Sequence, residues 1–247
     1  MDFSGRTILV TGASRGIGAA IARALADQGA AVGVNYHASE APAVALVDDI
    51  EKAGGRAVAL KADARDRTQV EGMAAQLAGA FGPITDLVIN ASIRFPMTGF
   101  LQYPWEAFEA KLVGEMGAAF HACRAVVPGM VERGGGSIVA ITSGLARDPG
   151  WGFCAHSAAK AALEGFVRAL AFELGPVGIR VNAVAPGLTL TDATAGLPEN
   201  AKAAAAQHTP LRRNGAPEDV AEAVVGLLGT GFVSGATLPV NGGIHVF

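Results

Sequence analysis

The sequence TILVTGASRGIGAAIARALA, residues 7–26, decides the fold. An apolar run leads into a glycine-rich turn, and a helix-like pattern follows directly. Gly12 permits a turn that a side chain would obstruct, Gly16 lets backbone N–H groups approach a diphosphate, and Gly18 lets the helix pack close to the strand. Unpaired N–H groups at the start of the helix favour negative charge there. The stretch therefore predicts a dinucleotide phosphate cradle, and a purely structural strand-to-helix turn is the alternative.

Composition narrows the class of protein. The chain has 247 residues, a hydrophobic content of 51% and a formal net charge of -3, which suits one α/β domain with a large core. The lysines and arginines are scattered, so we expect a small-molecule partner and neither nucleic acid nor an anionic membrane. The chain has only two cysteines, Cys123 and Cys154. It shows no charged-then-apolar leader at Met1 and no apolar run long enough to span a bilayer, so we expect a cytoplasmic protein.

Short apolar segments alternate with longer amphipathic ones, the pattern of a parallel sheet covered on both faces. Strands are predicted at residues 6–10, 31–35, 56–60, 86–90, 137–142, 179–184 and 237–240. Helices are predicted at residues 16–28, 40–53, 67–81, 103–132, 155–175 and 217–229. The only long stretch without a clear element is 188–215, which predicts either a substrate lid or a surface insertion. The fold class is thus α/β, with seven strands and helices on both faces.

The choice of coenzyme depends on the end of the second strand. A carboxylate there would hydrogen-bond the ribose 2′-hydroxyl of NAD, but the chain reads Tyr36-His37-Ala38-Ser39. Arg15 in the glycine turn, helped by His37 or Ser39, suits a 2′-phosphate, which favours NADP(H) over NAD(H). Alternatively, Arg15 is a solvated charge and Tyr36 simply packs on the adenine, which leaves the preference open.

Motifs along almost the whole chain together resemble the short-chain dehydrogenase/reductase family, in the group of 3-oxoacyl-carrier-protein reductases. They comprise Thr11 to Gly18, Asp63, Asn90-Ala91-Ser92, Ile141-Thr142-Ser143, Ser157 to Lys160, Arg180 to Gly187, Thr191, Pro217 to Ala221 and Val240 to Gly243. The resemblance implies a doubly wound Rossmann fold in a homotetramer or homodimer. It also implies that Asp63 contacts adenine, that Asn90 lies near the cofactor ribose, and that Pro186 to Thr191 embraces the nicotinamide end.

The cofactor site expected from the motif and the resemblance is therefore a set of loop residues. They are Gly12, Ser14, Arg15, Gly16, Ile17, Gly18, Tyr36, His37, Ser39, Asp63, Ala64, Asn90, Ala91, Ser92, Lys160, Pro186, Gly187, Thr189 and Thr191. No metal is expected, because the remaining histidines and the two cysteines lack metal-ligand spacing.

The chain departs from the family where a tyrosine is expected. The family resemblance implies that a serine orients the substrate carbonyl, a tyrosine passes the proton, a lysine holds the nicotinamide ribose, and an asparagine supports a water relay. Ser143 and Lys160 match, but the position four residues before the lysine and thirteen after the serine is His156. The asparagine position, judged from its spacing to the aromatic Phe120, is Glu115. His156 and Lys160 share one helical face, so both can reach one ligand.

An imidazole can exchange protons at neutral pH without help, because its pKa lies near 6.5 and that of a phenol near 10. The Lys160 ammonium would push His156 toward its neutral form, whereas a nearby Glu115 carboxylate would support the charged form. Alternatively, His156 is a degenerate position, Lys160 a solvated charge and Ser143 a loop hydroxyl. For Glu115, a salt bridge to Lys160 or Arg124 is as plausible as a catalytic role.

Aromatic residues follow the fourth and fifth predicted strands and suit a bulky apolar substrate. The expected pocket mouth comprises Ile93, Arg94, Phe95, Trp151 and Phe153, and the lid carries His208, Arg212 and Arg213. We weigh three hypotheses. The first is an NADP(H)-dependent oxidoreductase acting on a carbonyl or alcohol through His156. The second is a non-redox dehydratase, isomerase or cyclase using His156 and Glu115, and the third is a cofactor-binding protein without catalysis.

Overall fold

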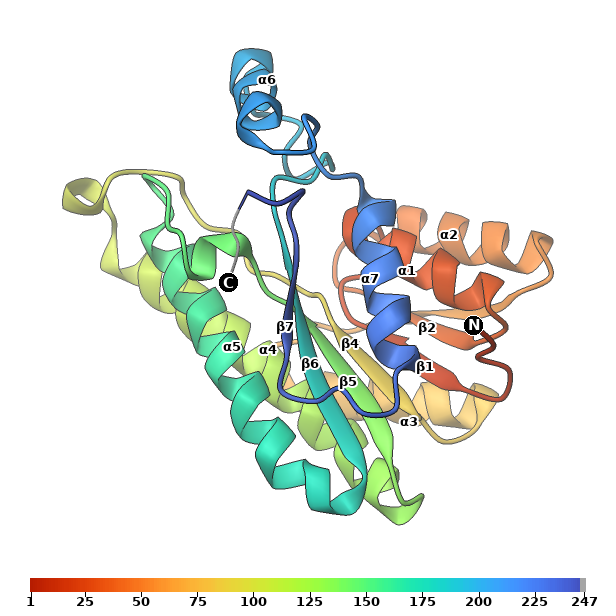
Figure 1. Cartoon of the computed structure of the whole chain (residues 1–247). Coiled ribbons are helices and arrows are strands. Elements are labelled where there is room, and N and C mark those ends of the chain that lie inside the picture. Colours follow the sequence, from red (N-terminus) through yellow and green to blue (C-terminus); the bar gives the residue numbers. More distant parts are fainter. Residues whose placement is uncertain (245–247) are drawn as a thin grey trace.

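A parallel sheet forms the centre of the computed structural model, which describes residues 1–244 (Figure 1). Its strands are β1 (Thr7–Val10), β2 (Ala31–Tyr36), β3 (Arg56–Lys61), β4 (Asp86–Ile89), β5 (Gly136–Ile141), β6 (Ile179–Pro186) and β7 (Thr237–Val240). They lie in the order β3-β2-β1-β4-β5-β6-β7, and all neighbouring pairs are parallel. The order reverses between β1 and β4, which makes this the point where loops diverge and ligands bind in such sheets. The predicted doubly wound, seven-stranded sheet is confirmed.

Helices cover both faces of the sheet. The helices α1 (Gly16–Asp27), α2 (Glu40–Lys52) and α7 (Pro217–Gly229) pack on one face. The helices α3 (Arg67–Phe81), α4 (Trp105–Glu132) and α5 (Cys154–Leu174) pack on the other. Several helices are followed by a glycine with positive φ, as after α2, α3 and α4 at Gly54, Gly82 and Gly134, because this residue pays no Cβ penalty in a left-handed cap.

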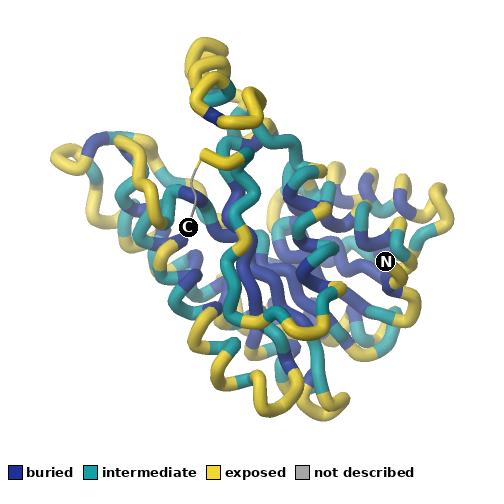
Figure 2. The backbone as a smooth tube through the Cα atoms, viewed as in Figure 1, coloured by how far each residue is buried: buried dark blue, intermediate teal, exposed yellow. Residues whose placement is uncertain are grey.

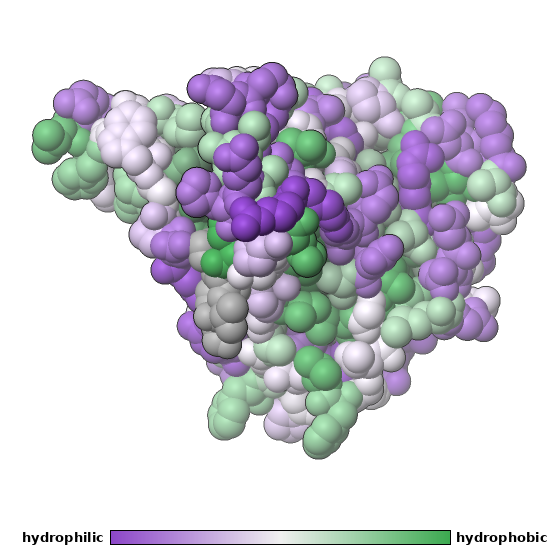
Figure 3. All heavy atoms as spheres, turned by 45° about the horizontal axis from the view of Figure 1, so that its top comes forward, coloured by the Kyte–Doolittle hydropathy of each residue, from purple (hydrophilic) through white to green (hydrophobic). Residues whose placement is uncertain are grey.

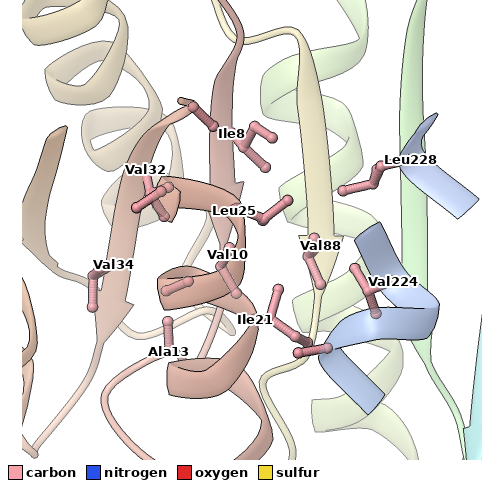
Figure 4. Close-up of a cluster of buried hydrophobic side chains, with 14 of the residues drawn as sticks. Ile8, Val10, Ala13, Ile21, Leu25, Val32, Val34, Val88, Val224 and Leu228 are labelled. Atoms are coloured by element: carbon pink, nitrogen blue, oxygen red, sulfur yellow. The ribbon is translucent and has the colours of Figure 1, made fainter. Parts of the chain in front are cut away.

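The core divides into two apolar clusters, one on each face of the sheet. In β1, Ile8 and Val10 pack with Leu25 of α1 on one face (Figure 4), whereas Leu9 belongs to the cluster on the other face. This alternation follows from the two-residue period of a strand, and because both faces are covered every residue of β1 is buried. Figure 2 shows the buried strands at the centre of the molecule. The carboxyl ends of β1, β4 and β5 are thus held on a rigid platform.

The stretch 188–215 contains a helix, so the expectation that it has no clear element was wrong. Helix α6 (Glu199–His208) has the sequence ENAKAAAAQH, and none of its residues is buried. Alanine has the highest helix propensity, but without a buried face there is no apolar periodicity to reveal the helix. Helix α6 projects from the body of the protein in Figure 1, and hydrophilic residues cover much of the face that carries it in Figure 3.

Candidate active site

The glycine turn between β1 and α1 has the geometry that its sequence requires. Gly12 and Gly16 have φ values of +62° and +55°, a region that residues with a Cβ rarely adopt. A Cβ on Gly12 would lie 2.8 Å from the Cα of Ala91, and one on Gly18 would lie 2.5 Å from Nδ2 of Asn90. The turn is therefore packed directly against the loop that follows β4, and side chains are excluded from it.

The buried amide of Asn35 and the half-buried amide of Asn90 hold this turn in place. The Oδ1 of Asn35 accepts a hydrogen bond from the N–H of Gly12 at 3.0 Å, while its Nδ2 donates to the carbonyls of Leu60 and Ala62 at 3.2 and 3.1 Å. From the other side, Nδ2 of Asn90 donates to the carbonyls of Thr11 and Gly12 at 3.0 and 2.9 Å. Asn35 is not among the residues that the sequence predicts for the site. An amide near the end of an otherwise apolar strand was the available signal, because buried polar groups need specific partners.

The start of α1 is open toward a ligand. Arg15 is the N-cap residue, and its side chain makes no capping hydrogen bond, so the first N–H groups of the helix keep their attraction for an anion. A Cβ on Gly16 would lie 3.4 Å from Cγ2 of Thr191. The segment after β6 therefore reaches back to the glycine turn. This cradle, which side chains would fill, fits the diphosphate of a dinucleotide.

The groups expected at the adenosine end gather around the ends of β2 and β3. Tyr36 is buried at the end of β2, and the exposed His37 places Nε2 at 3.8 Å from Oδ2 of Asp63. The side chain of Arg65 hydrogen-bonds Asp63 at 2.6 to 3.1 Å and lowers the pKa of that carboxyl to about 2. Asp63 is thus ionised and paired at neutral pH. Arg65, which the sequence analysis did not single out, neutralises this carboxylate, and Arg15 is exposed on the glycine turn.

Of the four residues of the expected catalytic set, Ser143, His156 and Lys160 belong to the segments that follow β5, and Glu115 belongs to α4. Ser143 caps the short 3-10 helix η2 (Gly144–Ala146), and its Oγ accepts a hydrogen bond from the N–H of Leu145 at 3.2 Å. Lys160 of α5 donates from Nζ to the carbonyl of Ile141 at 2.7 Å. This bond ties α5 to the strand that leads into Ser143. His156 lies one helical turn before Lys160, so the serine, the imidazole and the ammonium belong to one region.

His156 lies between aromatic rings and carries an unpaired nitrogen. Its ring stacks on Phe95 with centroids 4.8 Å apart and an interplanar angle of 23°, and Phe153 lies edge-on at 6.2 Å. Its Nδ1 atom is buried and has no hydrogen-bond partner among the described residues. Burial first, and then the ammonium groups of Lys160 and Lys111, lower the pKa of His156 to about 3, and Glu115 opposes this shift. The imidazole is therefore neutral at pH 7.

Glu115 is held between two buried lysines. Its Oε1 lies 2.6 Å from Nζ of Lys160, and its Oε2 lies 2.6 Å from Nζ of Lys111. Burial opposes ionisation, but the two ammonium groups prevail and lower the pKa of Glu115 to about 2. Of the alternatives that the sequence left open for Glu115, the structure shows the salt bridge to Lys160. The sequence analysis missed Lys111, although a glutamate and a lysine four apart on one helix are a standard ion-pair spacing.

The pocket mouth combines exposed aromatic and charged side chains. Trp151 is 78% exposed, and its ring lies 3.2 Å from the place that a Cβ on Gly99 would occupy. Arg94 is exposed, whereas Phe95 and Phe153 are half-buried. The mouth is thus bordered by the loops that follow β4 and β5, as their positions at the carboxyl ends of neighbouring strands predict.

The segment 188–215 lines a separate hollow at the end of β7. A cavity of about 500 Å³ lies between this segment and residues 238–244. Arg213 pairs with Asp219 at 2.6 Å, and Nδ1 of His208 contacts the carbonyl of Ala204 at 2.8 Å. The Arg212 side chain donates to the carbonyl of Gln207. Of the basic residues of the expected lid, His208 and Arg212 therefore bond to α6, and Arg213 bonds to α7.

Two further features concern residues 1–244 as a whole. No three side chains of histidine, cysteine, aspartate or glutamate gather there in a way that could hold a metal ion. None of the helices in that part of the chain has the length and apolar character needed to cross a membrane.

A doubly wound sheet with a glycine turn at its switch point is the architecture of dinucleotide-binding dehydrogenases. A family model described as enoyl-(acyl carrier protein) reductase matches residues 12–245. The chain belongs to the short-chain dehydrogenase/reductase family.

Relatives match over nearly their whole lengths. The chain is 38% identical over 247 residues to an L-rhamnose 1-dehydrogenase (NAD(P)(+)) of Sphingomonas sp. (strain SKA58), which covers 98% of this chain and 97% of that protein. It is 36% identical over 247 residues to the 7alpha-hydroxysteroid dehydrogenase of Escherichia coli (strain K12), covering 98% and 95%. The crystal structure of a dehydrogenase/reductase from Sinorhizobium meliloti 1021 superposes with a TM-score of 0.92 at 39% identity, covering 99% and 97%. These likenesses support an oxidoreductase of this family that acts on a small molecule.

Proposed function

We propose that this protein is an NADP(H)-dependent oxidoreductase that acts on a carbonyl or alcohol of a bulky apolar small molecule through an atypical Ser143, His156 and Lys160 site. The observation that carries the proposal is His156 itself. Its unpaired Nδ1 nitrogen lies in an aromatic pocket one helical turn from Lys160, at the carboxyl end of the sheet. A buried polar atom without a partner needs an explanation, and at the carboxyl end of this sheet a bound substrate would supply the missing partner.

Lys160 is suited to hold the coenzyme. An ammonium group has three protons, and in Lys160 they face the carbonyl of Ile141 and the carboxylate of Glu115, which leaves one for the nicotinamide ribose. The bound coenzyme supplies the hydride. Arg15 and the open N-terminus of α1 support NADP(H), because they present a cation and unpaired N–H groups where phosphates would lie. The relative named for both NAD(+) and NADP(+) is consistent with either coenzyme.

Ser143 and His156 would act together on the substrate oxygen. The Ser143 hydroxyl accepts a bond from the N–H of Leu145 and keeps its own proton to donate to a carbonyl. The imidazole of His156 is neutral in the free protein, but an alkoxide developing beside it favours the charged form. The neutral ring would therefore accept the hydroxyl proton of an alcohol as hydride leaves for the coenzyme, and in the reverse direction the protonated ring would return that proton to the substrate oxygen.

The substrate class follows from the pocket lining. Phe95 and Phe153 flank the imidazole, and Trp151 lies at the mouth, so flat apolar surface surrounds the reacting position. Such a lining favours a bulky ring system over a small polar compound. The relative that is a hydroxysteroid dehydrogenase agrees with this choice. We also propose that residues 188–215 act as a substrate lid and that the chain forms a single domain. The protein would assemble as a homotetramer or homodimer and work in the cytoplasm.

The test begins with titrations of NADPH and NADH, followed by a panel of cyclic and steroid ketones monitored by nicotinamide absorbance. We expect tighter binding of NADPH and turnover of at least one bulky ketone. His156→Ala should keep NADPH binding and lose about 10²-fold or more in turnover, the range of general acid–base catalysis. His156→Tyr should regain broad reductase activity if only the proton donor has changed.

Other outcomes separate the remaining hypotheses. Full activity of His156→Ala would remove the imidazole from the mechanism. Product formation without a change in absorbance would favour a dehydratase, isomerase or cyclase. The pairing of Glu115 with two lysines argues against its serving as a free proton shuttle in such an enzyme. No affinity for either coenzyme would reject the oxidoreductase.

A further inference from the structure

Lys111 is the most completely buried charged residue near the site, and the proposed mechanism does not use it. Its side chain is 0% exposed, and it lies on α4 one turn before Glu115. Moving an ammonium group into a protein interior is costly unless it is fully paired. A lysine in this position therefore needs a counter-charge and hydrogen-bond acceptors, and its neighbours supply both.

Three acceptors surround the Lys111 ammonium. Its Nζ atom donates to Oε2 of Glu115 at 2.6 Å, to Oγ of Ser92 at 2.9 Å and to the carbonyl of Ile93 at 2.9 Å. All three protons thus have partners. Glu115 also accepts the N–H of Ile93 at 3.1 Å. The loop after β4 is therefore fastened to α4 at one point by two opposite charges.

The same loop carries the aromatic wall beside the imidazole. Phe95 follows the fastened residues, and its ring lies 5.1 Å from Nζ of Lys111 and 4.8 Å from the ring of His156. Across Glu115, the contact continues to Lys160 at 2.6 Å. One buried cluster thereby touches both the wall next to His156 and the ammonium expected to hold the coenzyme.

We propose that Lys111 is a positioning residue that clamps Glu115 and the 92–95 loop together, so that Lys160 and Phe95 keep their places around His156. The lysine–glutamate clamp, meaning Lys111, Glu115 and Lys160, has two cations around one carboxylate. Its net charge is +1. Removal of the central carboxylate would therefore leave two buried ammonium groups facing each other without a counter-charge. Only the catalytic consequence of the clamp depends on the proposed function. Its structural role does not.

A double-mutant cycle tests the clamp on the full chain. Glu115→Gln leaves two uncompensated ammonium groups, so we expect a marked fall in the Tm. Lys111→Met leaves the Glu115 and Lys160 pair intact and should lower the Tm less. In Lys111→Met/Glu115→Gln the second ammonium is gone, so the double variant should melt at a higher temperature than Glu115→Gln alone. Losses that simply add would mean that the two residues do not work as a unit, which would overturn the proposal.

Binding measurements separate the clamp from general packing. Lys111→Arg keeps the charge and should retain more NADPH affinity than Lys111→Met, for which we expect a loss of about tenfold, equal to about 1.4 kcal/mol. Lys52→Met, which changes an exposed lysine on α2, serves as the matched control and should leave binding unchanged. If Glu115→Gln does not fold but the double variant does, the proposal is supported. If Lys111→Met melts and binds NADPH like the native chain, the proposal fails.

Turnover adds a readout that a purely structural role would not move. Where a ketone substrate has been found, Lys111→Met should raise its KM more than it weakens NADPH binding, because the loosened 92–95 loop forms the substrate wall. If no ketone is turned over, the proposed function fails, while the melting cycle and the NADPH titrations still decide the role of Lys111.

Discussion

Asn35 offers the sharpest test of how the fold prepares the coenzyme site. Its buried amide accepts from the N–H of Gly12 and donates to the carbonyls of Leu60 and Ala62. Asn35→Ala removes all three bonds at once and leaves the N–H of Gly12 without a partner. A buried polar group left unsatisfied costs about 1–3 kcal/mol. With the lost carbonyl contacts added, we expect a loss of about 2–4 kcal/mol in the free energy of unfolding.

The magnitude can be checked by denaturant unfolding and by NADPH titration. Because Gly12 opens the phosphate cradle, we expect NADPH affinity to fall by about tenfold, or about 1.4 kcal/mol. A second variant, Asn35→Asp, tests whether the donor side of the amide matters. It keeps an acceptor for the N–H of Gly12 but turns a carboxylate oxygen toward two carbonyls, so it should be less stable than Asn35→Ala.

Asn200→Ala, in which an exposed amide on α6 is removed, is the matched control and should change neither quantity. An unfolding free energy for Asn35→Ala within about 0.5 kcal/mol of the native value, the usual range for surface changes, would refute the reasoning. So would an Asn35→Asp variant that is as stable as the native chain.

Three further predictions concern the imidazole, the glycines and the coenzyme phosphate. The pKa of His156 is about 3 in the folded protein and about 6.5 in the unfolded chain. Between these pH values only the unfolded state binds the proton, so the free energy of unfolding falls as the pH falls. Between pH 7 and pH 5 this group should lower the free energy of unfolding of the native chain by about 2 kcal/mol. Denaturant unfolding should show a correspondingly smaller decrease for His156→Gln over the same interval. Gly18→Ala should abolish measurable NADPH binding because its Cβ would lie 2.6 Å from the carbonyl oxygen of Gly12, whereas Gly72→Ala, with nothing within 4 Å, should stabilise α3 by about 0.5–1 kcal/mol. Arg15→Ala should weaken NADPH more than NADH in parallel titrations, and an equal loss for both would remove Arg15 from recognition of the 2′-phosphate.

Local patterns in the sequence were sufficient to predict the sheet. The apolar strands and the glycines that end α2, α3 and α4 depend on short-range rules, and the predicted boundaries lie within two residues of those observed for β1 and α5. Helix α6 was not predicted, because only the helix propensity of its alanines favours it and it buries no apolar face. Periodicity reports burial, and a helix without a buried side gives no such signal.

The candidate site was predictable only where neighbouring residues define it. The pairing of His156 with Lys160 follows from their spacing on one helix, and so does the contact between Glu115 and Lys111. The link from Glu115 to Lys160 joins α4 and α5, and the stacking of Phe95 on His156 joins a loop to a helix. Such contacts depend on how elements pack, which the local sequence does not encode. The partners of Asn35 could not be predicted for the same reason, because Gly12 follows β1, Leu60 lies in β3 and Ala62 follows β3.

The charges around His156 bear on which chemistry the site favours. Burial and two ammonium groups keep the imidazole neutral, while Glu115 is ionised and saturated by those same lysines. A site with a neutral imidazole and a net positive cluster stabilises negative charge that develops on a bound group. In the proposed function, hydride addition to a carbonyl would place that charge on the substrate oxygen. Proton abstraction by a free carboxylate would need Glu115 to leave two ion pairs of 2.6 Å. The electrostatics therefore argue against a carboxylate-driven shuttle, because Glu115 is ionised and paired with both lysines.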